Sequence, residues 1–491
     1  MRYQKRSVSL GSTYRMVAYK TIEIIEAMTV QVLSLPAIWK TFLTKLLARR
    51  FVKDVGILTI ANCAGAALSF VQGILVARWL APELYGMAAL VMSYPNLIYT
   101  FFDTRSSQAS MKYLGEFHAR GERTRLLAMC KLGYAIDFAI ASSTFCLVVF
   151  TANWVAQRVV HHPEAAGLIV IYGATFVARA LVGTSYAVLA TLGRFSLIAW
   201  MDTLLTALRV ALVLGLVWAG WQVAGVIWGN VIASAVKGLL YGFVAWSQMY
   251  HTWGAIPLQG SWQVLKGRQW EIVGFLLYND LNALLGMIPQ QLDMLLLGYF
   301  RNQTEAGYYT LAKNLSSAVR YIAGPLQSVT YIELARLQGL GNKLALRQKV
   351  KRLAVRVGLP IELLMLVGIL FVCPGVLVLF GHSYLPALHA VQIMMVGNTV
   401  WLFGFWLRPL YFALGKVNLW TTAGALSLLV FLPLLPLMTW RWGYLGTAWW
   451  SFGLNGLAAT LALVCLRRLP LNSLPDTFLL LNEDMKSDRN R

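Results

Sequence analysis

The chain has 491 residues and a formal net charge of +22, from 42 Lys and Arg against 20 Asp and Glu. Charged residues make up only 13% of it and hydrophobic residues 58%, whereas a soluble domain carries about 25% charged residues. This balance excludes a disordered chain. It also disfavours a soluble nucleic-acid-binding protein, whose basic residues form a patch on a folded domain. The composition favours a polytopic membrane protein with basic loops on one side of the membrane.

The N-terminal segment, residues 1–54, is basic and shows no clear signal peptide. Its apolar stretch 21–38 is interrupted by two glutamates, so we expect a helix that lies on the membrane surface. An alternative is a start of translation at Met16 or Met28, which would leave part of this segment out of the protein. We expect no nucleic-acid partner.

Twelve segments are long and apolar enough to span a membrane, which takes about 20 mostly apolar residues. Strands are disfavoured, because a barrel strand needs only about 10 residues of alternating character. The sequence therefore predicts an all-α protein with about twelve membrane-spanning helices, at residues 55–77, 84–103, 126–151, 165–190, 195–218, 222–248, 271–298, 305–332, 356–380, 385–412, 417–439 and 443–466.

The loops differ strongly in charge between the two sides of the membrane. Side A, the side of the N-terminus, holds 31 of the 42 basic residues, the spans hold seven, and side B holds only Arg78, Arg158, Arg301 and Arg441. Loops rich in Lys and Arg stay in the cytoplasm. We therefore expect side A to be cytoplasmic, together with both termini and a polar tail at 467–491.

The two halves of the chain carry equal numbers of spans and a shared pattern. Residues 55–250 and 271–466 each hold six, and a linker at 251–270 with three spaced tryptophans is expected at the membrane interface. Residues 72–86 and 293–307 both end a helix, turn through a polar loop and reach a glycine, Gly86 or Gly307. These glycines would let helices approach closely. The pattern predicts two six-helix lobes with a site between them.

The stretch Gly73-Ile-Leu-Val-Ala-Arg-Trp-Leu-Ala-Pro-Glu-Leu-Tyr-Gly86 resembles the first-loop signature of the polysaccharide-exporter branch of the multidrug/oligosaccharidyl-lipid/polysaccharide (MOP) superfamily. So do Asp293-Met-Leu-Leu-Leu-Gly-Tyr-Phe and Glu305-Ala-Gly-Tyr-Tyr-Thr-Leu-Ala312. This branch includes the Wzx-type O-antigen flippases. The chain departs from it at Ala81, where the family often has Gly, and in its long N-terminal extension.

The resemblance implies a MATE-like architecture and a flippase of the bacterial inner membrane. Its cargo would be a lipid-diphosphate-linked oligosaccharide, such as an O-antigen (lipopolysaccharide) or exopolysaccharide repeat unit. Membrane lipids would surround it, and a polysaccharide polymerase or chain-length machinery is a candidate partner.

Basic residues inside the spans are costly, so each is expected to face a cavity or a partner. Four fall at mid-depth, and three nearer the ends, Lys131, Lys313 and Arg408, can reach the headgroups. The mid-depth residues lie on polar stripes with helical spacing. We expect Arg179, Arg209, Lys237 and Arg320, together with Lys313, to bind a diphosphate, and the sugar to be contacted by Tyr186, Asn230, Tyr241, Tyr309 and Gln327.

Carboxyl groups inside the spans have two interpretations. They can pair with the buried cations and hold helices together, or they can carry a coupling proton or sodium ion. The candidates are Asp137, Asp202, Asp280 and Asp293. No motif for a metal centre, a nucleotide-binding loop or a catalytic residue is found, so we expect no cofactor beyond that coupling ion.

Two other functions remain open at the level of sequence. A MATE-type cation or drug antiporter would favour a carboxylate-rich cavity, whereas the stripes here are cationic. A membrane polysaccharide polymerase or glycosyltransferase needs positioned acids or large outer loops, and the longest side-B loop, near 152–164, has about a dozen residues. The sequence therefore favours a transporter that is not an enzyme.

Overall fold

The computed structural model describes residues 37–103, 106–254, 260–265, 267, 271, 274, 289–339, 343–371 and 373–468, with side chains described from residue 61 onward. Contacts divide the chain into two compact units, residues 1–60 and 61–491. The first unit contributes the beginning of helix α2, at 37–60. The N-terminal surface helix expected at 21–38 lies almost wholly outside the described residues, as do the tail and most of the 251–270 linker.

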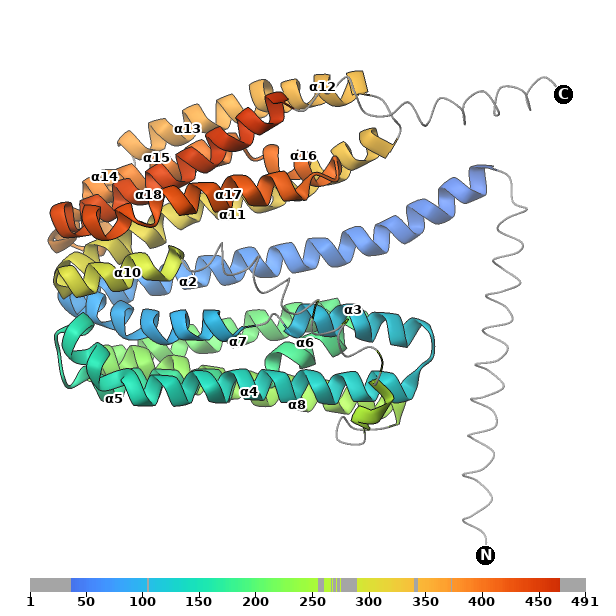
Figure 1. Ribbon diagram of the computed structural model, residues 1–491, viewed down its shortest axis with the longest axis horizontal. Coiled ribbons are helices and arrows are strands. Elements are labelled where there is room, and N and C mark those ends of the chain that lie inside the picture. The colour runs from blue at the N-terminus through green and yellow to red at the C-terminus, as the bar shows by residue number, and fades with distance from the viewer. Residues whose placement is uncertain are drawn as a thin grey trace, which may run out of the picture. The chain divides into compact units, whose positions relative to one another are not determined.

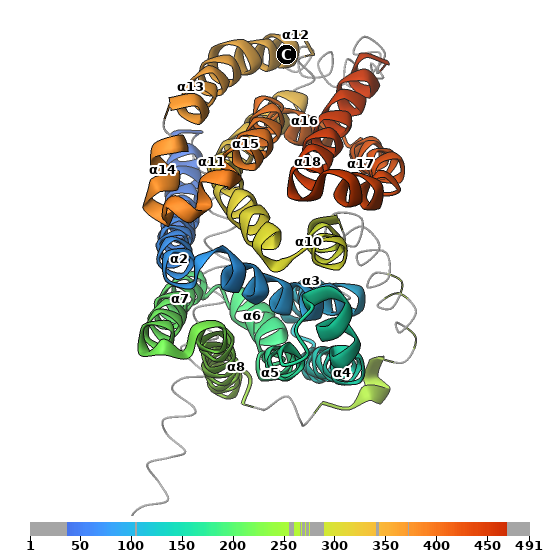
Figure 2. The same cartoon turned by 90° about the vertical axis from the view of Figure 1, so that its left-hand side faces the viewer.

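The second unit contains two groups of helices (Figures 1 and 2). The N-lobe comprises the 61–102 part of α2 (Ala37–Phe102), α3 (Ser106–Ala119), α4 (Arg123–Val155), η1 (Ala156–Val160), α5 (Ala165–Ala178), α6 (Val182–Thr191), α7 (Phe195–Leu216), η2 (Val217–Trp221) and α8 (Gln222–Trp253). A short turn, η4 (Trp262–Leu265), follows.

The C-lobe comprises α10 (Pro289–Phe300), α11 (Gln303–Gly339), α12 (Lys343–Arg352), η5 (Leu353–Gly358), α13 (Leu359–Phe371), α14 (Cys373–Phe380), η6 (His382–Ala387), α15 (Leu388–Phe403), α16 (Leu407–Ala413), α17 (Val417–Phe431) and α18 (Leu434–Arg468). Helices make up most of the described part of every expected span and no strand occurs among the described residues, so the all-α prediction is confirmed. Within the described residues, five helices are long and apolar enough to cross a membrane, or six if the bent pair Gln348–Ile369 and Cys373–Phe380 counts as one.

Sharp breaks separate two expected spans at three places, two of them inside a long helix and one between two helices. The breaks are at Ala81 in α2, at Gly220 and Gln222 between α7 and α8, and at Gly443 in α18. Each of these residues has a positive φ, which turns the chain back at side B. Ala81 has φ 59° and ψ 171°, a region that essentially only glycine occupies without strain. This explains why a glycine suits this position.

The buried apolar residues form separate clusters toward the two ends of the helices, which are the ends expected at side A and at side B. Near side A, the N-lobe has its own core around Tyr113, Leu189 and Tyr241, and the C-lobe has another around Leu334, Phe405 and Leu410. Near side B, a single core joins both lobes, from Leu90 and Val155 to Leu297, Leu311 and Tyr384. The lobes therefore share buried apolar surface at side B, whereas each side-A core belongs to one lobe.

Backbone contacts and hydrogen bonds reinforce the side-B junction. A Cβ atom added at Gly86 would overlap the carbonyl oxygen of Gln303, and one at Gly307 would overlap that of Pro82. The predicted close approach at the two repeated glycines is therefore confirmed. Further hydrogen bonds between the lobes run from Gln303 to the Val160 oxygen (2.7 Å), between the His161 ring and the Gly298 oxygen (3.0 Å), and from Tyr384 to the Ala77 oxygen (3.1 Å).

Candidate functional site

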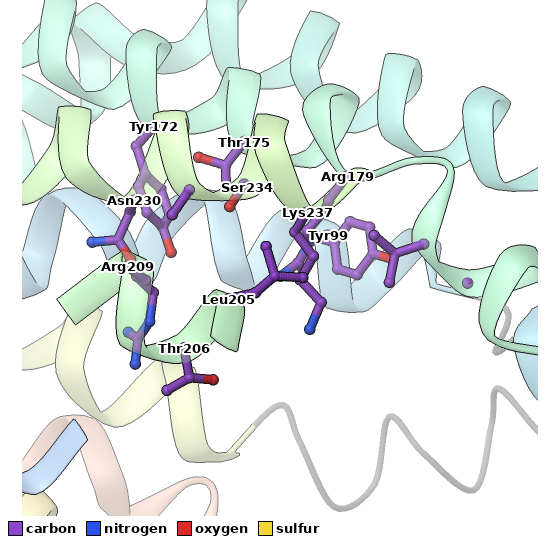
Figure 3. A pocket seen from close by; sticks show the side chains of 13 residues that line it. Tyr99, Tyr172, Thr175, Arg179, Leu205, Thr206, Arg209, Asn230, Ser234 and Lys237 are labelled. Carbon is purple, nitrogen blue, oxygen red and sulfur yellow. The ribbon is translucent and has the colours of Figure 1, made fainter. Parts of the chain in front are cut away.

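A polar cavity of about 480 Å³ lies inside the N-lobe. Three of its lining residues are the cations Arg179, Arg209 and Lys237, which come from the end of α5, from α7 and from α8. Figure 3 shows them with the polar groups around them. Three of the four predicted polar stripes thus face one cavity, whose lining is Tyr99, Tyr172, Thr175, Arg179, Val182, Gly183, Leu205, Thr206, Arg209, Asn230, Ala233, Ser234 and Lys237.

Arg179 sits where α5 ends, and its guanidinium lies over two aromatic rings. The Cζ atom is 5.1 Å from the ring centre of Tyr99 and 4.9 Å from that of Phe176, and the two rings are themselves stacked at 4.5 Å. Stacking against ring faces stabilises the cation, and Tyr99 is also a hydrogen-bond partner of Arg179, which leaves further donors of its five N–H groups. The guanidinium edge can therefore still donate to phosphate oxygens.

Arg209 and Lys237 each have a partner. Arg209 is half-buried and donates from Nη2 to the hydroxyl of Ser69 in α2 (2.8 Å). Lys237 donates from Nζ to Asp202 Oδ1 (2.7 Å), and both side chains of this pair are 37% exposed. Asp202, a candidate for ion coupling, thus forms an ion pair with a cavity cation.

Other groups in the lining can serve a sugar or phosphate ligand. Asn230, predicted to contact sugar, lines the cavity and uses its amide nitrogen to donate to the Val226 oxygen (2.8 Å). Thr175 is buried, and its hydroxyl has no hydrogen-bond partner among the described residues. A buried hydroxyl without a partner costs about 1–3 kcal/mol, which a ligand in the cavity could recover.

The structure places two of the tyrosines predicted to contact sugar outside this cavity. Tyr241 is fully buried in the side-A core of the N-lobe, and Tyr186 packs half-buried against that core. Both lie on the predicted stripes, at the end of each stripe nearest side A. Neither is among the lining residues of the cavity.

Lys313 and Tyr309 belong to a different cluster, in the C-lobe. Lys313 Nζ lies 2.9 and 3.0 Å from the two oxygens of Asp293, and the Tyr309 hydroxyl donates to Asp293 Oδ2 (2.7 Å). Asp293 is buried, with 3% of its surface exposed. This cluster matches the interpretation in which a carboxylate pairs with an intramembrane cation and joins two helices, here α10 and α11.

Of the three remaining predicted site residues, two lie partly or wholly outside the described part of the structure. Arg320 lies in α11, but its side chain is outside the described part, and Asp280 lies outside the described residues altogether. Gln327 is half-buried in α11. The described residues of the fourth predicted stripe lie on α11 in the C-lobe and are not among the lining residues of the N-lobe cavity. Among the described residues, no group of three or more His, Cys, Asp or Glu is placed to hold a metal ion.

Asp137, the remaining carboxyl candidate, lies beside the cavity rather than in its lining. It lines a smaller pocket of about 100 Å³ with Asp103, Ser106 and Arg179. Its carboxylate accepts hydrogen bonds from the Ser106 hydroxyl and from the backbone and hydroxyl of Thr184.

A second cavity, of about 350 Å³, lies between the lobes. It is lined mainly by apolar side chains, together with Ser69, Tyr85, Asn314 and Ser317. Ser69 also accepts the hydrogen bond from Arg209, so the two cavities are neighbours across α2. Sequence reasoning missed Tyr99, Tyr172 and Ser69, because tyrosines and serines in apolar runs carry no signal of which face is lined by a cavity.

The fold is shared with solved structures of membrane transporters, including two that are described as members of the MOP superfamily. A solved structure of the lipid II flippase MurJ in an inward closed conformation is similar with a TM-score of 0.67 and 14% identity, over 84% of this chain and 88% of that chain. The structure of an inward-facing multidrug resistance MATE family transporter of the MOP superfamily is similar with a TM-score of 0.65 and 14% sequence identity, over 82% of this chain and 94% of that chain. The structure of a MOP superfamily transporter from Pyrococcus furiosus is similar with a TM-score of 0.57 and 14% sequence identity, over 86% of this chain and 97% of that chain. No curated protein matches the sequence.

The long apolar helices define a multi-pass membrane protein, and the solved structures that share its fold are those of transporters and a flippase. The profile of the family described as polysaccharide biosynthesis protein matches residues 51–332, more than half of the chain. The chain belongs to this polysaccharide biosynthesis protein family. The resemblance noted at the two repeated loops is thereby confirmed.

Proposed function

We propose that the protein is a flippase for a lipid-diphosphate-linked oligosaccharide, an O-antigen or exopolysaccharide repeat unit, in the bacterial inner membrane. The observation that carries the proposal is the convergence of Arg179, Arg209 and Lys237 on one cavity inside the membrane-spanning part. Guanidinium groups are planar and can donate two parallel hydrogen bonds to phosphate oxygens, and the lysine ammonium adds a positive charge on a flexible side chain. A diphosphate is the part of such a cargo that this lining would recognise, and membership of a polysaccharide biosynthesis family supports the saccharide part.

Alternating access is the proposed mechanism. The shared core and the Gly86–Gly307 contact hold the lobes together at side B, while the side-A cores are separate. This arrangement fits a state that receives the headgroup from side A, the expected cytoplasmic side. Moving the lobes about the membrane midplane would then open side B and release the headgroup there. No covalent step is needed.

The proposed energy source is a proton or sodium ion, with Asp293 as the first candidate for carrying it. Asp293 is buried in the C-lobe beside Lys313 and Tyr309. A proton or sodium ion could take the place of the Lys313 ammonium at its carboxyl group. Asp137, Asp202 and Asp280 are the other candidates.

A MATE-type cation antiporter is the main alternative, because MATE transporters share the fold. An organic cation would meet three like charges in the cavity, of which one, Lys237, is paired with a carboxylate. The lining therefore favours an anionic ligand.

The test uses the full-length protein in vesicles that carry a fluorescent lipid-diphosphate disaccharide, with quenching of outward-facing label as the measure of translocation. Arg179→Ala and Arg209→Ala should each slow translocation at least about tenfold, since a hydrogen bond to a charged group contributes about 1.5–3 kcal/mol. Arg158→Ala, which removes an exposed arginine at side B, should not. Normal rates in both cavity variants would refute the proposal. Arg320→Ala tests the remaining predicted contact.

A further inference from the structure

The fourth span is interrupted beside the cavity. Helix α5 ends at Ala178, α6 begins at Val182, and the Val182 nitrogen donates to the Arg179 oxygen (2.9 Å) across a tight turn. Breaks in helices normally arise at proline, at glycine or where a side chain from elsewhere intervenes. The turn residues Arg179, Ala180 and Leu181 include neither proline nor glycine, whereas a side chain from a neighbouring helix contacts the first turn of α6.

Asp137 on α4 supplies this side chain. Its Oδ2 atom accepts a hydrogen bond from the Thr184 backbone nitrogen (3.0 Å) and another from the Thr184 hydroxyl (2.7 Å). Its Oδ1 atom accepts from the hydroxyl of Ser106, at the start of α3. The first amides of a helix lack intrahelical acceptors and attract negative charge. One carboxylate from another span thus binds the first turn of α6.

Two glycines give the break the space it needs. A Cβ atom at Gly183 would lie 3.0 Å from Asp137 Oδ2, so a larger residue would crowd the carboxylate. A Cβ atom at Gly238 of α8 would overlap the carbonyl oxygen of Ala178, the last residue of α5. The break is therefore held between α4 and α8, with Asp137 as its polar contact.

Arg179 occupies the first position of this turn. Its guanidinium lies over Tyr99 and Phe176, and it lines both the large cavity and the small pocket that contains Asp137. Were α6 to continue α5 without interruption, the backbone at residue 179 would be helical and the side chain would leave from a different direction. The place of the guanidinium thus depends on the break.

We propose that Asp137 is a positioning residue for the diphosphate site. By holding the first turn of α6 it maintains the interruption of the fourth span, and it thereby sets the guanidinium of Arg179 over the two rings and into the cavity. Asp137 acts through Thr184 and the backbone and does not itself contact the ligand. The ligand in this inference rests on the proposed function.

A double-mutant cycle on the purified full-length protein tests the inference, with farnesyl diphosphate and farnesyl monophosphate as soluble probes. Arg179→Ala and Asp137→Ala should each weaken diphosphate binding about tenfold, and monophosphate binding clearly less. The double variant should bind no more weakly than Arg179→Ala alone, because both substitutions remove the same interaction. Asp137→Asn, which keeps one acceptor oxygen, should fall between wild type and Asp137→Ala.

The matched control is Ser107→Ala. Ser107 lines the same small pocket as Asp137 but is not among the three donors to its carboxylate, so its substitution should leave both affinities unchanged. The inference would be overturned if the fold losses of diphosphate affinity in Arg179→Ala and in Asp137→Ala multiplied in the double variant. So would a diphosphate affinity that Arg179→Ala lowers and Asp137→Ala leaves intact.

Hydrogen exchange separates this inference from the proposed function, because it needs no ligand. In Asp137→Ala the amides at 182–185 should exchange at least about tenfold faster, and in Ser107→Ala they should not. If Arg179→Ala leaves diphosphate binding intact, the proposed site is wrong, and the exchange data still decide whether Asp137 holds the break. Unchanged exchange in Asp137→Ala overturns the inference whatever the ligand.

Discussion

Gly86 and Gly307 lie against each other's helix at side B, at equivalent positions of the two repeated loops. A Cβ atom at Gly86 would lie 2.5 Å from the backbone nitrogen of Gly307 and would overlap Gln303, and one at Gly307 would overlap Pro82. The contact between the lobes is thus made by backbone on both sides.

Gly86→Ala and Gly307→Ala are each expected to destabilise the side-B junction, because backbone cannot move aside as a side chain can. Overpacking of this kind costs about 1–3 kcal/mol, and thermal unfolding in detergent measures it. The control is Gly167→Ala, in α5, where an added Cβ has no neighbour within 4 Å; this change should be neutral or slightly stabilising. An unchanged melting temperature in both junction variants would contradict the expected overlap.

Ala81→Gly is expected to stabilise the protein. Ala81 has φ 59° and ψ 171°, and a non-glycine residue in this region carries about 1–3 kcal/mol of strain. Part of the relief is lost again to the greater freedom of glycine in the unfolded chain, so we expect a gain of about 1 kcal/mol in thermal unfolding experiments. Ala211→Gly in the regular helix α7 should instead destabilise by about 1 kcal/mol. A loss of stability in Ala81→Gly would be the contrary result.

Asp202→Asn is expected to strengthen the binding of farnesyl diphosphate a few-fold. It removes the carboxylate that pairs with Lys237, and the effect stays modest because a half-exposed ion pair is worth little more than about 1 kcal/mol. Lys237→Met should weaken binding. Glu122→Gln removes the carboxylate of a partly exposed pair with Arg125, outside the cavity, and serves as control. Weaker binding in Asp202→Asn would argue against an anionic ligand.

Asp293→Asn is expected to destabilise the C-lobe. The change leaves the partly buried ammonium of Lys313 without the carboxylate that now lies 2.9 Å away, and breaking a buried pair from one side costs about 3 kcal/mol. Adding Lys313→Met should restore much of the stability, which thermal unfolding of the single and double variants would show.

The same pair of variants tests the coupling ion. If Asp293 carries it, Asp293→Asn/Lys313→Met will fold but translocate at a rate that no longer responds to pH or to sodium. A response equal to that of wild type would assign the coupling to another group.

Hydropathy was sufficient to predict the helices, because a membrane span must bury its backbone groups in its own hydrogen bonds. The interruption after Arg179 was not predictable, since its cause is a carboxylate some forty residues earlier in the chain and the turn itself holds no proline or glycine. Likewise Ala81 could be recognised only as a departure from the resembling family, and its positive φ appears in the structure alone.

The candidate site was predicted in part. Helical spacing predicted that Arg179, Arg209 and Lys237 each share a polar face with their neighbours on the same helix, because residues three and four apart lie on one face. The structure places all three in the lining of one cavity; their role in binding a diphosphate stays a prediction. The same spacing also included Tyr241, which is buried in the side-A core. Helical spacing predicts which residues share a face of the helix. It does not predict which part of that face lines a cavity and which part is buried in a core. The ion pair between Asp293 and Lys313 joins residues twenty positions apart on two helices. The periodicity of the sequence within one helix cannot reveal such a pair.

The backbone contact between the repeated loops has a consequence for how the protein can diversify. Backbone carbonyls and glycines make the central part of the side-B junction. The side chains that would recognise a cargo are therefore not part of this contact. If the proposed function is right, residues that line the N-lobe cavity can change with a new saccharide while the side-B junction stays the same. Recognition and closure are thus encoded in different parts of the chain, and a graft of cavity residues between relatives should alter what is carried without altering how the two halves meet.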